Sequence, residues 1–246
     1  MFIVVLFLSL AVLSSAGPVN QPEPCETPLQ WEGTAWHDNE EDGVMIVSEL
    51  SYDAKDDRIR TLSHILNGPE SGKSFEMILL YSEERFYFIP QEGKEHCAVS
   101  NRFRSYIPAG VPLDANFVYH TVRGLGKNSV TTNTFALAYE VGAAKNQEEL
   151  LRRDHQHFGH THTWYGSFTP TACIPVLETI YEGDTLDEDA LLERTETLHS
   201  IRFSDMSLGI KDPKVFEPPS YCKDLGNATL SSVIQKNLHW HRFAYL

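Results

Sequence analysis

The stretch Cys25-Glu26-Thr27-Pro28-Leu29-Gln30-Trp31-Glu32-Gly33 is the first part of the chain with the character of a folded protein. Pro28 prevents a helix from running through it, because proline lacks the backbone N–H and restricts the residue before it. Trp31 and, beyond Gly33, Trp36 then supply large apolar surface. The stretch predicts the first strand of a sheet, an edge strand that Cys25 ties to a distant point of the chain.

Residues 1–16 have the pattern of a secretory signal peptide. They carry no charge, are apolar up to Leu13, and place Ser14 and Ala16 at the small-residue positions of a signal peptidase site. The apolar run is too short to span a bilayer. We therefore expect a secreted chain, with residues 17–24 as a flexible, proline-rich lead-in and residues 25–246 as a single β domain.

The chain is acidic, and this limits its partners. Its formal net charge is −14, which argues against nucleic acid and against constitutive binding to anionic membranes at neutral pH. The sequence also contains 11 histidines, which would reduce the negative charge steeply between about pH 7 and pH 5. In an acidic compartment the surface would repel anionic lipids far less.

Four cysteines, Cys25, Cys97, Cys173 and Cys222, follow the signal peptide. None forms a Cys-x-x-Cys pair, so zinc ribbons and thioredoxin-like redox sites are not expected. Two disulfide bonds are the natural interpretation in a secreted chain, and spacing alone leaves three connectivities open. Asn227 begins the single Asn-x-Ser/Thr sequence and is the expected glycosylation site.

Short alternating or apolar runs, separated by turn residues, predict about ten strands. Residues 43–65 and 75–89 predict two hairpins. Helix signals are few and short. The predicted fold is therefore mostly β and antiparallel, with a barrel or sandwich form and a few short helices. The further strands are expected at 117–122, 135–141, 164–168, 174–181 and 198–203, and the helices at 148–153, 187–194 and 230–240.

Aromatic residues make up 11% of the chain, and many fall on alternating strand positions. Such side chains share one face of a sheet, where they either pack on each other or enclose an apolar ligand. The alternation alone does not decide between the two. The expected lining of a lipid-binding interior is Phe75, Phe86, Phe88, Phe135, Leu137, Tyr139, Trp164 and Phe168.

The run from Asp154 to His162 is the candidate metal site. It contains two His-x-His pairs whose alternate imidazoles suit zinc or copper. A solvated loop and a pH-sensing element are the other interpretations. The acidic clusters 38–42 and 184–189 lack the EF-hand pattern, so they predict solvated turns or weak calcium binding. The candidate metal ligands are His155, His157, His160 and His162.

Sequence motifs of known catalytic sites are missing. The chain has no Gly-x-Ser-x-Gly, no His-Glu-x-x-His and no partnered Ser-x-x-Lys. Gly124-x-Gly126 lacks the third glycine and the strand-to-helix context of a nucleotide site. We expect a protein without enzymatic activity and without a required cofactor. A metal-dependent enzyme that uses the histidine run is the remaining alternative.

A set of short segments occurs in a characteristic order over residues 24–222. Its most specific part lies near the end, before Cys222. Taken together, the segments resemble the ependymin family of secreted proteins. They are Pro24-Cys25 with Pro28, Gln30-Trp31-Glu32-Gly33, Tyr52-Asp53, Arg58-Ile59-Arg60, Gly166-Ser167-Phe168, Cys173-Ile174-Pro175-Val176, Phe203-Ser204-Asp205-Met206, Gly209-Ile210, Asp212-Pro213, Val215-Phe216, Pro218-Pro219 and Cys222.

This resemblance implies two antiparallel sheets that form a half-open barrel, similar to bacterial lipoprotein carriers of the Lol type. It implies an apolar pocket for gangliosides or anionic phospholipids, and it pairs Cys25 with Cys173 and Cys97 with Cys222. It also implies extracellular or lysosomal residence and often a homodimer. The leading expectation is a secreted, non-enzymatic, lipid-binding glycoprotein. The alternative is a calcium-binding protein of the extracellular matrix, active in cell–matrix adhesion, without a functional lipid cavity.

Overall fold

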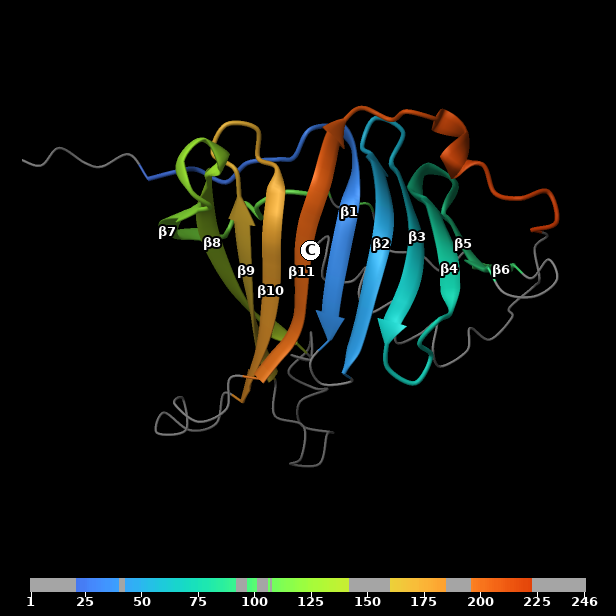
Figure 1. The fold of residues 1–246 in the computed structure, drawn as a ribbon, viewed down its shortest axis with the longest axis horizontal. Helices are drawn as coiled ribbons and strands as arrows, with labels where there is room; N and C mark the ends of the chain where they lie inside the picture. The colour runs from blue at the N-terminus through green and yellow to red at the C-terminus, as the bar shows by residue number, and fades with distance from the viewer. Residues whose placement is uncertain are drawn as a thin grey trace, which may run out of the picture.

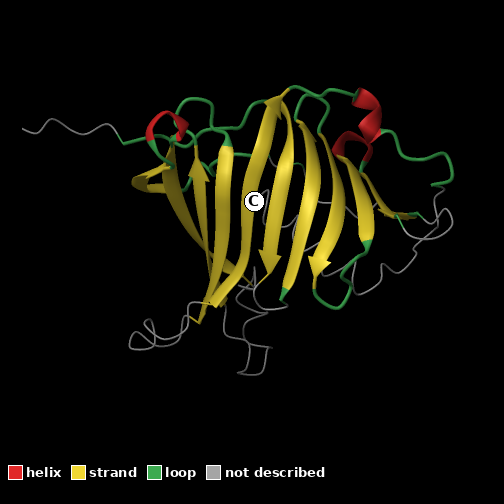
Figure 2. Ribbon diagram, viewed as in Figure 1, coloured by secondary structure: helices red, strands yellow, loops and turns green. Residues whose placement is uncertain are grey.

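The computed structural model describes residues 21–39, 43–91, 97–100, 106, 108–141, 160–184 and 196–222. Its strands form a single antiparallel sheet in the order β6-β5-β4-β3-β2-β1-β11-β10-β9-β8-β7 (Figures 1 and 2). The strands are β1 (Gln30–Asn39), β2 (Val44–Asp53), β3 (Arg58–Asn67), β4 (Ser74–Leu80), β5 (Arg85–Pro90), β6 (Ala98–Ser100), β7 (Asn116–Arg123), β8 (Val130–Val141), β9 (His160–Phe168), β10 (Pro175–Asp184) and β11 (Glu196–Leu208). The described part also contains the short 3-10 helices η1 (Tyr81–Glu83), η2 (Gly126–Asn128) and η3 (Pro213–Phe216).

The sheet curves from one edge to the other without closing, so it has a concave inner face and a convex outer face (Figure 1). The expected mostly β, half-open architecture is confirmed. The two halves, β1–β6 and β7–β11, are not separate sheets, because β1 and β11 hydrogen-bond to each other and join them. The helices expected at 148–153, 187–194 and 230–240 lie outside the described residues.

The first strand is central, and the prediction of an edge strand was wrong. β1 pairs with β2 from Gln30↔Asp53 to Asn39↔Val44, and on its other side with β11. Residues 25–29 precede the strand, and Glu26 there forms an isolated bridge with Gly110. The partner strand β11 lies far along the chain, so no local pattern around Trp31 could indicate that both edges of β1 are paired.

The two predicted hairpins are present because each has turn residues that accept a left-handed backbone. β2 and β3 are joined by a turn with Asp57 at φ 47°, and β4 and β5 by a turn with Glu84 at φ 52°. Strand alternation then places every second side chain on the same face. On β4, Phe75 and Met77 lie on the inner face, while Ile78 lies on the outer face.

Apolar side chains gather in three clusters among the described residues. The first inner cluster consists of Trp31, Ile46, Leu50, Tyr52, Ile59, Ile65, Phe75, Met77, Leu79, Phe86, Phe88 and Ala109. The second inner cluster consists of Val111, Ala115, Phe135, Trp164, Phe168, Cys173 and Ile180. The outer cluster consists of Ile78, Leu80, Tyr87, Ile89, Cys97 and Phe216, and it lies under η3.

The segment around η3 covers the outer face of β3 and β4. The guanidinium of Arg58 lies 4.4 Å from the ring centroid of Phe216 and 2.8 Å from Oδ2 of the fully buried Asp53. A disulfide bond between Cys97 and Cys222 ties the end of this segment to the region before β6. These contacts cover part of the outer face of the first half of the sheet, so the inner face is the candidate for ligand binding.

Candidate functional site

The inner face of the sheet contains most of the residues predicted to line an apolar interior. Phe75, Phe86 and Phe88 belong to the first inner cluster. Phe135, Trp164 and Phe168 belong to the second, and Leu137 packs against it. Tyr139 lies on β8, where the structure describes its backbone but not its side chain. The structure thus divides the predicted set between the two halves of the sheet instead of bringing it together at one place.

In the first inner cluster, aromatic rings pack on each other along the sheet. Trp31 and Tyr52 stack with their centroids 5.3 Å apart, and Phe75 and Phe88 do the same at 5.3 Å. The hydroxyl of Tyr52 accepts hydrogen bonds from the backbone N–H of Ala109 at 2.9 Å and from the hydroxyl of Tyr106 at 2.6 Å. This buried tyrosine therefore attaches the segment before β7 to the inner face.

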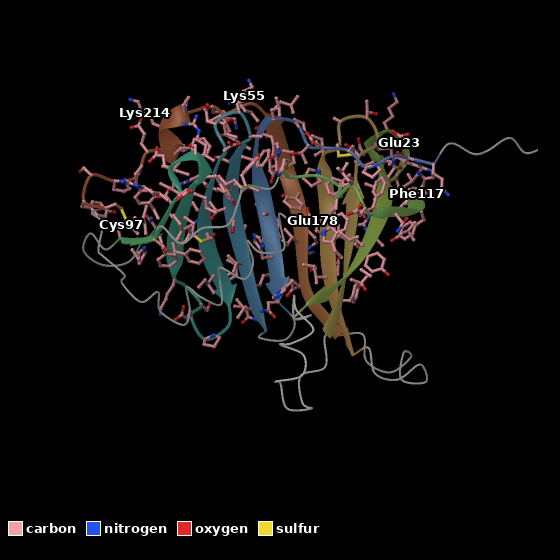
Figure 3. The ribbon with its side chains drawn as sticks, turned by 180° about the vertical axis from the view of Figure 1, so that it is seen from behind. Glu23, Lys55, Cys97, Phe117, Glu178 and Lys214 are labelled. Atoms are coloured by element: carbon pink, nitrogen blue, oxygen red, sulfur yellow. A yellow bond between two sulfur atoms is a disulfide. The ribbon has the colours of Figure 1, made fainter. Side chains whose placement is uncertain are left out.

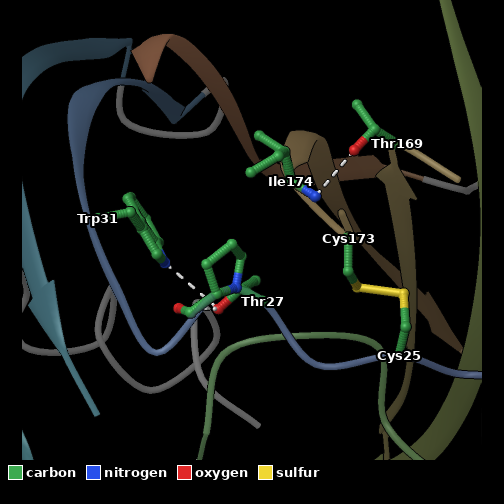
Figure 4. The surroundings of a disulfide bond; sticks show 7 residues. Cys25, Thr27, Trp31, Thr169, Cys173 and Ile174 are labelled. Carbon is green, nitrogen blue, oxygen red and sulfur yellow. Dashed lines mark hydrogen bonds between the residues drawn. A yellow bond between two sulfur atoms is a disulfide. The ribbon is translucent and has the colours of Figure 1, made fainter. Parts of the chain in front are cut away.

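That segment crosses the inner side at the end of the sheet where β1 begins (Figure 4). The N–H of Thr27 donates to the carbonyl of Ala109, and the N–H of Val111 donates to the carbonyl of Cys25. Cys25 is bonded to Cys173, whose Cα lies 5.9 Å away, so the same point is fixed to the second half of the sheet. The two disulfides in the structure have the pairing that the family resemblance implies.

Trp31 helps to hold this crossing in place. Its Nε1–H donates to Oγ1 of Thr27 at 3.2 Å, within the stretch that opens the folded chain (Figure 4). Near the disulfide, the N–H of Ile174 donates to Oγ1 of Thr169 at 3.0 Å. A hydrogen-bonded and disulfide-linked segment therefore crosses one end of the inner face.

The second inner cluster is built around a glycine on β9. Gly166 lies opposite Phe135 on β8 and Glu178 on β10. A Cβ at Gly166 would overlap the rings of Trp164 and Phe168, so only glycine leaves room for both. The ring centroids of these two residues lie 6.1 Å apart, and they cover the position where a side chain would stand.

Glu178 is the chemically distinctive residue of this face, and it lies near the middle of the sheet (Figure 3). It is buried, and Nε1–H of Trp164 donates to its Oε2 at 3.2 Å. Burial raises the pKa of the Glu178 carboxyl to about 8, an effect that the hydrogen bond from Trp164 partly opposes. The carboxyl is therefore mainly protonated at neutral pH, and it offers an O–H donor and a carbonyl acceptor.

Apolar and polar residues of the neighbouring strands continue the inner face beyond Glu178. Its cross-strand partner on β11 is Ile201, which in turn pairs with His37 on β1. On β2 and β3, Ser48 and Ser63 are buried and share a hydrogen bond of 2.8 Å. The described residues thus place two apolar clusters on the inner face, with polar groups between and beside them.

Sequence reasoning missed Glu178. Its position in the predicted strand at 174–181 contained the signal, because Glu178 and Ile180 are two residues apart and so share a face. An acidic residue in such a strand is normally assigned to the solvent side, since a buried charge is costly. The neutral form removes much of that cost, and the sequence pattern does not show protonation.

The predicted metal and glycan sites are not placed by the structure. His155, His157 and Asn227 lie outside the described residues, and only the backbone of His160 and His162 is described, on β9. Most of the acidic clusters at 38–42 and 184–189 is likewise outside. Within the residues that the structure describes, no group of three or more His, Cys, Asp or Glu side chains is arranged to hold a metal ion.

Comparison with known families identifies the family of this chain. The family model described as Ependymin matches residues 69–222, which is more than half of the chain. The chain belongs to the ependymin family. Mammalian ependymin-related protein 1 from Mus musculus is 32% identical over 217 residues, covering 87% of this chain and 83% of the relative. The protein of that name from Rattus norvegicus is 30% identical over 215 residues, with the same coverage.

Structural comparison adds little beyond the family. A Thermus thermophilus protein, described as an uncharacterized conserved protein, aligns with 80% of this ependymin-family chain and 89% of its own length. The TM-score is 0.46 at 8% sequence identity, a likeness too remote to inform function. In the described part of the chain, no helix is long and apolar enough to cross a membrane.

Proposed function

We propose that this ependymin-family protein is an extracellular, non-enzymatic carrier that binds lipid acyl chains along the inner face of its sheet. Family membership supports an extracellular protein. The observation that carries the proposal is the distribution of the apolar side chains. The inner sides of the two halves form two separate clusters among the described residues, not one closed core.

An acyl chain gains free energy from contact with such a surface. Each buried methylene contributes about 0.8 kcal/mol, so a chain that lies across several strands is held without any specific polar contact. The protonated state of Glu178 favours this use, because it keeps the middle of the inner face uncharged at neutral pH. A polar group of the lipid, such as an ester or hydroxyl, would find a hydrogen-bonding partner there.

Native mass spectrometry of the protein secreted by eukaryotic cells tests the proposal. The wild-type protein is expected to carry co-purified lipid. The variant Leu137→Ser removes apolar surface beside the second inner cluster and is expected to reduce the lipid-bound fraction. The matched control Ala138→Ser changes the exposed neighbour on the same strand and is expected to leave that fraction unchanged.

The acidic composition favours a second candidate, a calcium-binding protein of the extracellular matrix that acts in cell–matrix adhesion. A net charge of −14 attracts divalent cations to the surface, whether or not a lipid site exists. Secreted protein without bound lipid, together with saturable calcium uptake in equilibrium dialysis, would support this function and overturn the carrier. Equal lipid loading of Leu137→Ser and Ala138→Ser would show that the lipid does not bind beside the second inner cluster.

A further inference from the structure

We propose that the hairpin formed by β7, η2 and the start of β8 docks the protein on the surface of an anionic lipid bilayer. This edge hairpin comprises residues 116–131. Among the described strands, β7 is the last of the sheet and pairs with β8 alone (Figure 1). The inference rests on the surface of the hairpin and not on the proposed lipid carrier.

The first observation is the exposure of apolar side chains on the hairpin. Among the described residues, nine large apolar side chains are exposed, and five of these lie between positions 118 and 130. Leu125 at the turn is 90% exposed, and Val122 is 63% exposed. Such concentration in one projecting element is unusual for a surface that only meets water, and it is typical of interaction sites. The five residues are Val118, Tyr119, Val122, Leu125 and Val130.

The shape of the hairpin explains why these side chains remain uncovered. Phe117 packs against Phe135 with centroids 5.9 Å apart, which anchors the base of the hairpin to the second inner cluster. Beyond this anchor, the residues of β7 are largely exposed on both faces. The turn is tight, since a Cβ at Gly124, where φ is 97°, would lie 2.5 Å from the carbonyl oxygen of Asn128. The turn therefore has a defined structure, with η2 at the edge of the sheet (Figure 2).

The second observation is the local charge. Residues 115–139 contain no Asp or Glu, although the whole chain has 34 acidic residues and a net charge of −14. Arg123 and Lys127 lie in this region, and both are exposed. The edge hairpin is thus apolar and cationic on an otherwise acidic protein. Exposed apolar side chains with flanking cations are the combination that binds at the interface of anionic membranes.

The negative charge of the rest of the protein favours an orientation in which only the edge hairpin faces the bilayer. Repulsion between the remaining surface and an anionic bilayer is screened beyond about 10 Å at 0.1 M salt, so an element at the end of the sheet can approach while the rest stays away. Pairing of two copies through the free edge of β7 is the competing use of the hairpin. Such pairing would cover the strand but would leave Leu125 and Lys127, at the turn, in water.

Co-sedimentation with vesicles tests the proposal. The wild-type protein is expected to bind vesicles that contain phosphatidylserine, and to bind phosphatidylcholine vesicles much more weakly. Leu125→Ser is expected to weaken binding about tenfold or more, because burial of one leucine accounts for that much. The pair Arg123→Gln and Lys127→Gln is expected to weaken it about 30-fold at low salt, since each cation near an anionic surface contributes about fivefold.

Matched controls use exposed residues elsewhere. Leu208→Ser removes an apolar side chain that is 73% exposed on β11, and Lys55→Gln removes an exposed cation in the β2–β3 turn. Both are expected to bind like the wild type. Failure of the wild type to bind either vesicle, or equal binding by Leu125→Ser and Leu208→Ser, would overturn the proposal. A hairpin variant that dissociates a dimer in sedimentation velocity while vesicle binding is unchanged would assign the surface to a second copy instead.

Lipid loading in native mass spectra separates this proposal from the carrier function. Leu125→Ser is expected to retain co-purified lipid, because Leu125 is exposed at the turn and belongs to neither inner cluster. Retained lipid with lost vesicle binding would support docking by the hairpin. Lost lipid with retained vesicle binding would contradict it.

Discussion

Replacing Glu178 by glutamine should make the protein more stable at neutral pH and leave its stability in acid unchanged. The pKa of the Glu178 carboxyl is about 8 in the folded protein, because of burial, against 4.5 in the unfolded chain. Below pH 4.5 the group is protonated in both states. Between pH 4.5 and 8 the unfolded chain releases the proton while the folded protein keeps it, so the free energy of unfolding falls as the pH rises.

The pH dependence of the free energy of unfolding sets the size of the expected effect. Each pH unit in this window costs about 1.4 kcal/mol, so the carboxyl lowers stability by about 3 kcal/mol at pH 7, relative to acid. Glutamine has no charge to release, and its side-chain carbonyl can still accept the hydrogen bond from Trp164. The difference in stability between Glu178→Gln and the wild type should therefore grow from near zero at pH 4.5 to about 3 kcal/mol at pH 7.

Urea unfolding followed by tryptophan fluorescence at several pH values measures this difference. The imidazoles of the same face, His37 on β1 and His199 on β11, are present in both proteins, so their contributions largely cancel in the comparison. A difference that stays constant from pH 4.5 to 7.5 would refute the reasoning, because it would mean that Glu178 is ionised inside the folded protein. Lower stability of the variant at pH 7 would refute it as well.

Three other substitutions probe the scaffold of the inner and outer faces. Gly166→Ala should lower the free energy of unfolding by about 1–3 kcal/mol, since its Cβ must displace two aromatic rings; unchanged urea unfolding would contradict this. Asp53→Asn should cost on the order of 2 kcal/mol, because it weakens the buried pair with Arg58, and a thermal melt measures the loss. Changing both Cys25 and Cys173 to serine should cost up to about 5 kcal/mol in the chain-entropy model for a loop of 148 residues, and denaturant midpoints should fall accordingly.

Strand positions could be predicted from the sequence because their signal is local. A side chain repeats its face every second residue, so Phe75 and Met77 identify an inner face of β4 without knowledge of its neighbours. Hairpin turns are equally local, and Asp57 and Glu84 show the left-handed backbone that such turns need. The same alternation correctly selected six inner-face aromatic residues that the structure buries.

Pairing between distant strands could not be predicted in this way. Nothing near Trp31 reveals that β11, which begins at Glu196, occupies the second edge of β1. That single pairing turns two sheets into one, and it decides whether the inner faces of the two halves belong to one surface. The division of the predicted lining between two clusters could not be predicted either, because alternation assigns a residue to a face but not to a place on it.

The continuous sheet also explains why a buried acid can persist on this face. Strand β10, which carries Glu178, also carries Ile180 of the second inner cluster, and Trp164 of that cluster donates to the Glu178 carboxyl, so the acid lies beside this cluster on the side of β11. Glu178 gives this side of the cluster a group that is mainly neutral at pH 7 and able to form hydrogen bonds. If lipid occupies the inner face, Glu178 would keep a hydrogen-bonding group for the ligand. The lower stability that it causes at neutral pH is then the expected cost of this function. Glu178→Gln preserves hydrogen bonding while Glu178→Leu removes it, so lipid loading that falls only in the leucine variant would connect that cost to binding.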